Sequence, residues 1–307
     1  MIRLVAHRGG GGVRVENTLA AFANAVALGA AGAELDAHLT ADGQVVVHHD
    51  AYLNPSYCRH KGVWIEQTAA PALAELKLEA LADYDIGMPR PGSDYARRFD
   101  RILPVEGQRI PTLRDVIQLV KSMSDNFFLV IEIKSSVLDG SLRDAVHLVD
   151  AVLEVVEQES FGHRFCLCSF DWRALHYAVG VRKGTRAWFN SHPLSWYGSS
   201  QPSADDIPPS SDYLSRFRAA YKAGGSWFGQ FDPRNFDGSF AEAIAAAGGD
   251  TWFLYHTDCV TSRVEECRAH GLMSGGWSVN LRDAGALRAL EEAGADWACI
   301  DYPDMLV

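Results

Sequence analysis

Short apolar runs alternate along the chain with longer segments whose apolar residues recur at helical spacing. Nine such runs, each bounded by Gly, Asp, Ser or another polar residue, predict buried strands at residues 2–7, 32–37, 127–133, 164–170, 185–189, 226–230, 251–255, 272–279 and 297–301. The intervening segments predict helices at residues 18–28, 112–121, 142–157, 171–179, 213–223, 240–247, 262–270 and 283–293. This order is typical of βα units built around a parallel sheet.

A (β/α)8 TIM barrel, which is an α/β fold, accounts for this alternation and for the length of 307 residues. Such a barrel has eight strands, so one of the nine candidates lies outside it. Periodicity does not choose among 185–189, 226–230 and 251–255, and of these three we doubt 251–255 first.

Two long stretches interrupt the alternation. Residues 51–109 are rich in Arg, Pro and Gly and predict an insertion after the second strand. We therefore expect one catalytic domain over 1–307, with 51–110 as an inserted subdomain. Residues 190–211 are too polar and too rich in Pro to form a regular element. Loops of this length in compact domains are usually lids or binding loops.

Composition narrows the class of protein. The net charge is -11 and no basic run is present, which argues against a nucleic-acid partner but not against one phosphate held by a few basic side chains. The six cysteines form no C-x-x-C pair, which favours reduced thiols. The sequence has neither the apolar core of a signal peptide nor a run of about 18 apolar residues, so we expect a soluble, cytoplasmic protein without integral membrane association. The oligomeric state is not indicated.

Acidic side chains lie near the ends of two predicted strands. Glu34 and Asp36 share one face of their strand because side chains alternate, and Glu132 likewise shares a face with Lys134. Together with His7 they lie at the carboxyl ends of strands, where the active sites of parallel α/β folds gather. Three such carboxylates repel one another and lose solvation unless a cation compensates. Oxygen ligands of this kind suit one divalent cation, Mg²⁺ or Ca²⁺.

Short motifs around these residues occur in the order of a known family. The chain carries HRG at 7–9, ENT-x-x-AF at 16–22, E-x-D at 34–36, T-x-D-G at 40–43, HD at 49–50, IEIK at 131–134, SFD at 169–171, WSVN at 277–280 and IDYPD at 300–304. In this order and spacing the chain resembles the glycerophosphodiester phosphodiesterase family over residues 2–304. The resemblance implies a (β/α)8 barrel with a small subdomain inserted after the second strand. Val15 stands where the family usually has Pro, which affects a turn rather than the chemistry.

The resemblance also implies which histidines act. His7 and His49 correspond to a general acid/base pair that flanks the scissile phosphodiester. Only one of the neighbours His48 and His49 can enter the pocket from an extended VVVHHD, and the HD motif selects His49. His38 falls on the face of the acidic pair if the strand continues, and we interpret it as lying behind the ligands or at the surface.

The remaining polar roles follow from the same resemblance. Glu34, Asp36 and Glu132 match the metal ligands of the family. The ion would polarise a phosphoryl oxygen and lower the pKa of an attached hydroxyl. Arg8 and Lys134 would contact the phosphate oxygens, and ion pairing with the same carboxylates is the alternative reading of both.

Aromatic residues near the predicted strand ends could form an apolar wall for the substrate. Trp277 and Phe170 are the candidates for the glycerol or alcohol moiety, although aromatic residues near barrel strands are more often core. Four more aromatic residues near the long loop suggest a hypothetical sugar or choline wall: Trp188, Trp196, Tyr197 and Trp227. We expect Asn17 and Thr18 to cap the first helix, and we assign Asp301 no role.

The implied reaction is the metal-dependent hydrolysis of a glycerophosphodiester to sn-glycerol 3-phosphate and an alcohol. In the family the free 2-hydroxyl of the glycerol attacks phosphorus to give a cyclic phosphate that water then opens. The sequence does not distinguish this route from direct attack by water. It also does not identify the alcohol that is released. Related phospholipase D or C barrels acting on lysophospholipids or sphingolipids remain alternatives, as does a barrel that only binds a phosphodiester. The presence of both histidines and all three acids favours catalysis.

Overall fold

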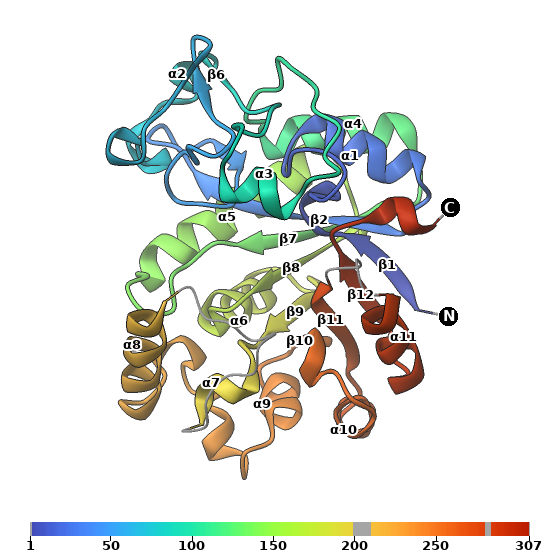
Figure 1. The fold of residues 1–307 in the computed structure, drawn as a ribbon. Helices are drawn as coiled ribbons and strands as arrows, with labels where there is room; N and C mark the ends of the chain where they lie inside the picture. Colours follow the sequence, from blue (N-terminus) through green and yellow to red (C-terminus); the bar gives the residue numbers. More distant parts are fainter. Residues whose placement is uncertain (1, 199–209, 280–283, 307) are drawn as a thin grey trace.

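Eight parallel strands of the computed structural model close into a barrel (Figure 1). The structure describes residues 2–198, 210–279 and 284–306. The barrel strands are β1 (Arg3–Ala6), β2 (Gly32–Leu39), β7 (Phe128–Ile133), β8 (Phe165–Ser169), β9 (Ala187–Asn190), β10 (Thr251–Tyr255), β11 (Met273–Val279) and β12 (Trp297–Ile300). The first strand closes the barrel because β1 pairs in parallel with both β12 and β2. The predicted TIM barrel is confirmed.

Helices cover the outside of the barrel and connect successive strands. They are α1 (Leu19–Ala27), α4 (Leu113–Met123), α5 (Leu142–Gln158), α6 (Trp172–Val181), α7 (Leu194–Tyr197), α8 (Ser211–Lys222), α9 (Phe240–Ala246), α10 (Thr261–Ala269) and α11 (Ala284–Ala293). The connection between β9 and β10 is the longest, since it carries α7, α8 and α9 in place of one helix. Three sequence predictions extend beyond the described residues: Asn280 of the WSVN motif, Asp283 of the last helix, and residues 199–209 of the long loop.

Side chains alternate along each barrel strand between two cores. On β7 and β9, Val130 and Trp188 point into the barrel and pack with Trp297 of β12. Their neighbours Ile131 and Phe189 point outward and join the larger core between the barrel and the helices. The next inward position toward the carboxyl end of each strand therefore lies nearer the mouth of the barrel.

One of the nine apolar runs is a turn rather than a strand. The run that we doubted, 251–255, forms β10, so that prediction is wrong. The run outside the barrel is 226–230, which contains a 3-10 turn at Ser226–Phe228 between α8 and α9. Gly225 and Gly229 flank this turn with φ of 53° and 60°, which a strand does not adopt. The run is apolar because its two aromatic side chains are buried.

The predicted insertion forms a small layer over the carboxyl end of β2 (Figure 1). It contains α2 (Leu78–Leu81), α3 (Asp94–Arg98) and a three-stranded sheet of β4 (Arg59–His60), β5 (Val63–Trp64) and β6 (Tyr84–Asp85). It has an apolar cluster of its own, made of Leu53, Tyr57, Cys58, Leu73, Leu81, Ile86 and Ile110 with Val15 and Val46 from the barrel side. A short strand that the sequence did not predict, β3 (Val45–Val47), pairs antiparallel with β2 and leads into the insertion.

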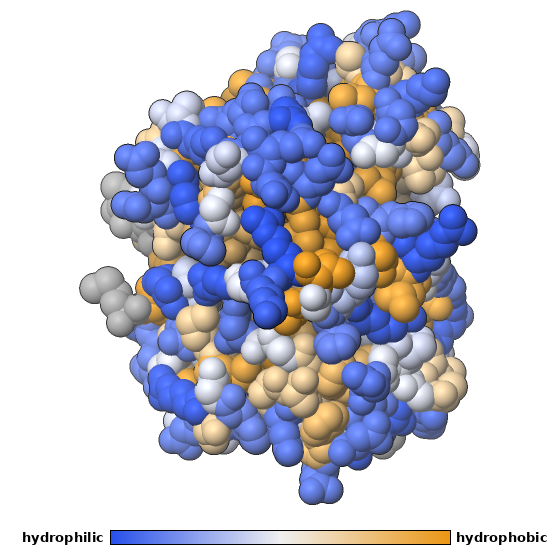
Figure 2. Space-filling model, turned by 180° about the vertical axis from the view of Figure 1, so that it is seen from behind, coloured by the Kyte–Doolittle hydropathy of each residue, from blue (hydrophilic) through white to orange (hydrophobic). Residues whose placement is uncertain are grey.

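The molecular surface is mainly hydrophilic. On the face in Figure 2, hydrophobic side chains come to the surface in a hollow near the middle. All six cysteines are buried and none is paired in a disulfide. Among the described residues, no helix combines the length and the apolar character that crossing a membrane requires.

Candidate active site

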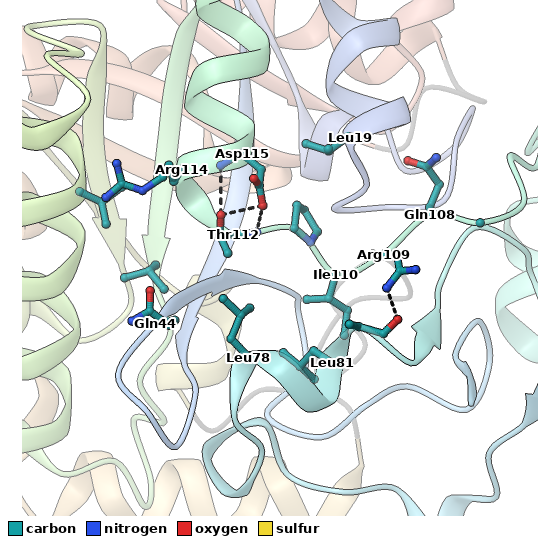
Figure 3. A pocket seen from close by; sticks show the side chains of 15 residues that line it. Leu19, Gln44, Leu78, Leu81, Gln108, Arg109, Ile110, Thr112, Arg114 and Asp115 are labelled. Carbon is teal, nitrogen blue, oxygen red and sulfur yellow. Dashed lines mark hydrogen bonds between the residues drawn. The ribbon is translucent and has the colours of Figure 1, made fainter. Parts of the chain in front are cut away.

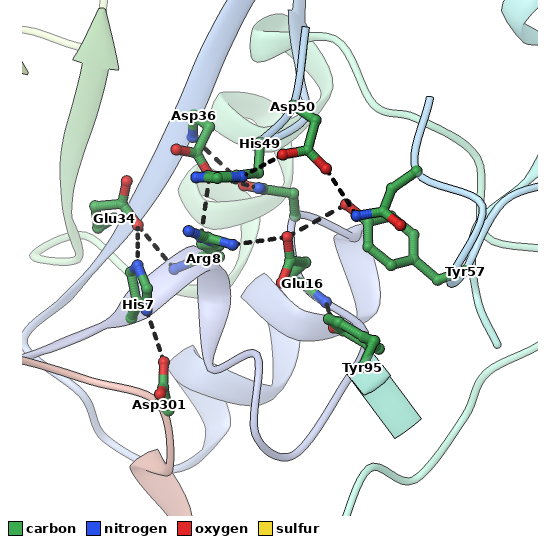
Figure 4. A network of polar contacts seen from close by, with 12 residues as sticks. His7, Arg8, Glu16, Glu34, Asp36, His49, Asp50, Tyr57, Tyr95 and Asp301 are labelled. Carbon is green, nitrogen blue, oxygen red and sulfur yellow. Dashed lines mark hydrogen bonds and ion pairs between the residues drawn. The ribbon is translucent and has the colours of Figure 1, made fainter. Parts of the chain in front are cut away.

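The carboxyl ends of the barrel strands bring the predicted site residues together. Eight of the nine line one cavity of about 450 Å³: His7, Arg8, Glu34, His49, Glu132, Lys134, Phe170 and Trp277. The ninth, Asp36, is fully buried and pairs with Lys134 and with Arg8, the latter visible in Figure 4. The structure thus brings together the residues that the sequence singled out, and Glu34 and Asp36 share a face of β2 as the alternation predicted.

Three carboxylates meet beside this cavity, two of them at its wall and one buried behind it. Glu34, Asp36 and Glu132 each offer an oxygen, and these oxygens lie within 4.8 Å of one another. Among the described residues, no hydrogen bond reaches the buried Oε1 of Glu34, and Oδ1 of Asp36 has only an ion pair. Burial and the charge of Asp36 raise the pKa of Glu34 to about 8. This arrangement is costly for the protein alone and needs a cation.

Two basic side chains compensate the carboxylates in part. Nζ of Lys134 lies 3.3 Å from Oδ1 of Asp36 and 3.2 Å from Oε1 of Glu132. Nε of Arg8 lies 3.4 Å from Oδ2 of Asp36, and its main-chain N–H donates to Glu34 at 2.9 Å. Burial raises the pKa of Asp36, but the charges of Lys134, His49 and Arg8 outweigh it and hold that pKa well below its usual range.

The balance of charge in this cluster fits a divalent ion. Lys134 is shared between Asp36 and Glu132, and Arg8 is shared between Asp36 and Glu16, so neither basic side chain serves one acid alone. The donor set consists of oxygens alone, which suits a hard cation such as Mg²⁺ or Ca²⁺. The residues present therefore fit the predicted metal.

Each candidate catalytic histidine is held by a carboxylate at its Nδ1 atom. Nδ1 of His7 lies 2.6 Å from Oδ1 of Asp301, and Nδ1 of His49 lies 2.8 Å from Oδ1 of Asp50. Asp50 is fixed in turn by Asn54, whose Nδ2 donates to it at 2.7 Å. A carboxylate in this position orients the ring and selects the tautomer that leaves Nε2 for the substrate.

The surroundings of His7 favour its charged form. Burial and the charge of Arg8 lower the pKa of His7, whereas the hydrogen bond to Asp301 and the charges of Asp301 and Glu34 raise it, and the net pKa is raised. Asp301 had no predicted role. Side-chain alternation along β12 could have placed Asp301 at the site. Cys299 points into the barrel, and Asp301 follows it by two positions on the same face.

His38 and His48, the other two histidines near the E-x-D and HD motifs, lie outside the cavity, as predicted. His48 is fully buried with its ring edge against Tyr57. Nε2 of His38 contacts the main-chain oxygen of His49 at 3.2 Å. Burial lowers the pKa of His38 to about 4.

The turn before α1 supports Arg8 and corrects one prediction. Thr18 caps the helix as expected, since its Oγ1 accepts from the main-chain N–H of Ala21 at 3.1 Å. Asn17 does not cap it. With φ of 56°, Asn17 turns its amide toward Asp36 and donates to Oδ2 at 2.7 Å. It therefore holds a candidate metal ligand.

The insertion contacts the site through Glu16. Oε1 of Glu16 accepts from Arg8 at 2.9 Å and from the hydroxyl of Tyr57 at 3.2 Å. The main-chain N–H of Glu16 donates to the hydroxyl of Tyr95 at 3.2 Å. Both tyrosines belong to the insertion, so this segment fixes the guanidinium that faces the cavity (Figure 4).

Aromatic rings form one wall of the cavity. Phe170 and Trp277 meet edge to face with ring centroids 5.3 Å apart, and Tyr255 meets Trp277 in the same way at 5.0 Å. Trp196 of α7 also lines the cavity. The sequence reasoning missed Tyr255 because it doubted that residues 251–255 form a strand.

The second set of aromatic residues does not form the wall that the sequence suggested. Trp188 lies inside the barrel against Phe128 and Trp297, where it fills the core. Trp227 and Tyr197 pack on other aromatic rings between the helices. Of these four candidates only Trp196 reaches the cavity, since the other three fill the interior.

A second, smaller cavity adjoins the first. It measures about 330 Å³, and four residues line both cavities: His7, Arg8, His49 and Arg98. Residues that line the smaller cavity alone are mostly polar and include Asp50, Asn54 and Tyr95. The two candidate catalytic histidines thus stand where two cavities meet, a position that suits the phosphorus of a diester with one arm in each cavity.

A further cavity of about 680 Å³ lies between the insertion and helices α1 and α4 (Figure 3). Leu19, Leu78, Leu81 and Ile110 line it. Its polar residues serve the fold: Thr112 and Asp115 form the capping box of α4, Arg109 donates to the main-chain oxygen of Ala82, and Arg114 pairs with Glu159. This cavity holds no group that suggests chemistry.

Comparison with known proteins identifies relatives over most of the chain. The model of the "Glycerophosphoryl diester phosphodiesterase family" matches residues 7–305. A glycerophosphodiester phosphodiesterase from Caldanaerobacter subterraneus subsp. tengcongensis is 32% identical over 177 residues, which are 57% of this chain and 59% of that protein. A lysophospholipase D from Mus musculus is 36% identical over 146 residues, 47% of this chain and 40% of that protein. The alignments span about half the length of these curated relatives.

Solved structures share the fold over the whole chain. A candidate glycerophosphoryl diester phosphodiesterase from Silicibacter pomeroyi DSS-3 is 26% identical with a TM-score of 0.80, covering 100% of this chain and 92% of that one. A phosphodiesterase from Oleispira antarctica, solved in complex with the product sn-glycerol-3-phosphate, has a TM-score of 0.65 at 19% identity and covers 99% of this chain and 94% of that one. At that identity the second likeness bears on the fold alone.

Proposed function

Because the chain belongs to the glycerophosphoryl diester phosphodiesterase family, we propose that it hydrolyses glycerophosphodiesters to sn-glycerol 3-phosphate and an alcohol. The observation that carries this proposal is the position of His7 and His49. Each is oriented by a carboxylate, and both line the junction of two cavities beside three clustered acids. The relative from Caldanaerobacter subterraneus bears the name of this activity, and the Oleispira antarctica protein binds its product.

In the proposed mechanism the two histidines exchange protons with the substrate. One takes the proton of the attacking hydroxyl and the other gives a proton to the leaving alkoxide, a contribution of typically ~10²- to 10⁴-fold. The carboxylates of Asp301 and Asp50 stabilise each imidazolium as it forms. The free 2-hydroxyl of the glycerol is the proposed nucleophile, and water opens the resulting cyclic phosphate.

Basic side chains and a metal ion would stabilise the charge on the phosphate. Arg8 and Lys134 line the cavity and donate to the phosphoryl oxygens. Glu34, Asp36 and Glu132 would hold Mg²⁺ or Ca²⁺, which supplies a Lewis acid for a phosphoryl oxygen and lowers the pKa of a bound hydroxyl. Asn17 keeps Asp36 in place for this task.

Release of an alcohol from a lysophospholipid is a second candidate function. The relative from Mus musculus is a lysophospholipase D, and the wall of Phe170, Trp196, Tyr255 and Trp277 offers apolar surface to an acyl chain. Turnover of lysophosphatidylcholine and glycerophosphocholine under the same conditions separates the two functions.

The test is release of glycerol 3-phosphate from a panel of glycerophosphodiesters, with and without chelator, by wild type and His49→Ala. We expect chelator and His49→Ala each to reduce the rate by at least ~100-fold. His270→Ala is the matched control, because His270 is exposed at the end of α10, and this variant should keep full activity. Wild type that releases no glycerol 3-phosphate from any member of the panel would refute the proposed function. A substrate without the 2-hydroxyl that reacts at an undiminished rate would refute the cyclic route alone.

A further inference from the structure

The inward face of β9 ends at Asn190, within the candidate active site. Trp188 lies two positions earlier on the same face, inside the barrel, so Asn190 is the next inward residue toward the mouth. It lines the cavity that Phe170, Tyr255 and Trp277 also line. The strand predicted from the sequence ends one residue earlier, at 189, and Asn190 was not among the predicted site residues.

The side-chain oxygen of Asn190 has no hydrogen-bond partner among the described residues. The residue is 4% exposed, and its Oδ1 atom is buried without a hydrogen bond. Polar groups around it are already engaged, since Nε1 of Trp172 donates to the main-chain oxygen of Asn190 and Nε1 of Trp277 donates to that of Ser191. The hydroxyl of Ser191 accepts from Nε1 of Trp252. Buried amides are nearly always hydrogen-bonded, so this one needs a partner that the described chain does not supply.

Two unpartnered indole nitrogens inside the barrel differ from Asn190 in their position. Nε1 of Trp188 and Nε1 of Trp297 also lack hydrogen bonds, but both rings pack inside the barrel and line neither cavity of the site. Asn190 alone among these three can meet a ligand. Its amide can present either end to the cavity, because a half-turn about χ2 exchanges oxygen and nitrogen.

We propose that the side-chain amide of Asn190 hydrogen-bonds the terminal hydroxyl of the glycerol arm, whose carbon chain packs on Phe170 and Trp277. This inference rests on the proposed function and names how that site selects its substrate. The cavity of Asn190 is also the one lined by Glu34 and Glu132, beside which the proposed mechanism puts the glycerol 2-hydroxyl. A hydroxyl both donates and accepts, so it satisfies the amide in either orientation.

The consequence is selection for a free glycerol hydroxyl. A site that hydrogen-bonds a substrate hydroxyl rejects the analogue that lacks it, because the buried polar group is then left unpaired. A quaternary ammonium group would pack on the same aromatic wall but would leave the amide without a partner. We therefore assign this cavity to the polyol arm rather than to a choline group.

The test compares sn-glycerophosphocholine with its 1-deoxy analogue, in which propane-1,2-diol replaces glycerol. We expect wild type to favour the parent substrate by at least ~10-fold in kcat/KM, and Asn190→Leu to treat the two substrates almost equally. Asn190→Ala serves as a second variant if the leucine does not fit. A preference that both variants keep unchanged, or an equal loss on both substrates, would overturn the inference.

A control on the same strand separates binding from packing. Phe189→Leu alters β9 on its outward face, and it should keep the preference of wild type even if the absolute rate falls. Failure of the proposed function is recognised separately, as the absence of turnover on both substrates. In that event, calorimetric binding of sn-glycerol 3-phosphate and of propane-1,2-diol phosphate to wild type and Asn190→Leu decides the role of the amide. Equal affinities in wild type would refute it.

Discussion

The two candidate catalytic histidines obtain their carboxylates by different routes. His49 is paired with Asp50, its neighbour in the chain, whereas His7 is paired with Asp301, at the other end of the sequence. The carboxylate fixes the imidazole ring and supports its charged form in both cases. Asp301 hydrogen-bonds His7 and lines the smaller cavity but not the larger one, so we regard it as a residue that positions His7.

Loss of the Asp301 charge should therefore reduce the chemical step more than binding. We expect Asp301→Asn to lower kcat by ~100-fold or more, within the range that a positioned acid or base contributes, while KM changes little. Steady-state release of glycerol 3-phosphate measures both constants. A KM effect that exceeds the kcat effect would contradict a positioning role.

The same substitution at the other end of β12 supplies the control. Asp296 precedes the strand, and its Oδ2 accepts from the main-chain N–H of Ser274 at 2.9 Å, far from the mouth of the barrel. Asp296→Asn thus removes a structural carboxylate while the site stays intact. Asp296→Asn should lower the melting temperature but leave kcat unchanged. If both variants lost kcat equally, the effect of Asp301→Asn would be one on folding.

At the scale of elements, the strand period predicted which side chains face the site but not which apolar runs are strands. Alternation correctly opposed Glu34 and Asp36 to Leu35, and it separated His48 from His49. The apolar run at 226–230 resembles a strand in composition because burial demands apolar residues in a turn as well. The hydrophobic pattern indicates which residues are buried but not their backbone conformation. In this turn the conformation depends on the flanking glycines.

The insertion has a small core of its own, so a single substitution in that core should destabilise it. Leu73 is 1% exposed in the apolar cluster of the insertion. We expect Leu73→Ala to cost about 2–5 kcal/mol and to make residues 51–110 the first site of proteolysis. Activity should fall too, because Tyr57 of the same cluster holds Glu16 and through it Arg8.

Leu103→Ala is the matched control for this prediction. Leu103 belongs to the same insertion, but its side chain is 59% exposed, so the change should alter stability by no more than ~0.5 kcal/mol. Urea unfolding and limited proteolysis compare the two variants. Cleavage of Leu73→Ala that begins equally in the barrel and in the insertion would show that the two parts unfold as one unit.

At the scale of the whole molecule, barrel closure creates contacts that local sequence reasoning does not reach. The pairing of β1 with β12 brings His7 to Asp301 across 294 positions. Asn17 meets Asp36 because the turn before α1 folds back over the end of β2. The motifs identified the ends of the strands, whereas the partners across these ends depend on closure of the sheet and on the exact turn geometry.

Burial of a histidine between the helices gives the whole molecule a predictable dependence on pH. The ring of His192 packs against Phe170, Trp196 and Phe217, and burial lowers its pKa to about 3. In the unfolded chain His192 has a pKa of about 6.5. At a pH between about 3 and 6.5, His192 is therefore protonated in the unfolded chain and neutral in the folded protein. The contribution of His192 to the free energy of unfolding is therefore constant above pH ~6.5 and falls by about 1.4 kcal/mol per unit as the pH drops toward 3.

Replacement of His192 should remove this slope from the stability curve. We expect the free energy of unfolding of His192→Phe to fall less steeply than that of wild type, with a difference of about 2–3 kcal/mol accumulated between pH 6.5 and 4.5. Urea unfolding at pH 6.5, 5.5 and 4.5 measures both curves. Repacking of the larger ring against Phe217 can shift the whole curve up or down, so the slope rather than the absolute stability is the criterion. Parallel curves for the two proteins would mean that His192 gains a proton in the folded state as readily as in the unfolded chain.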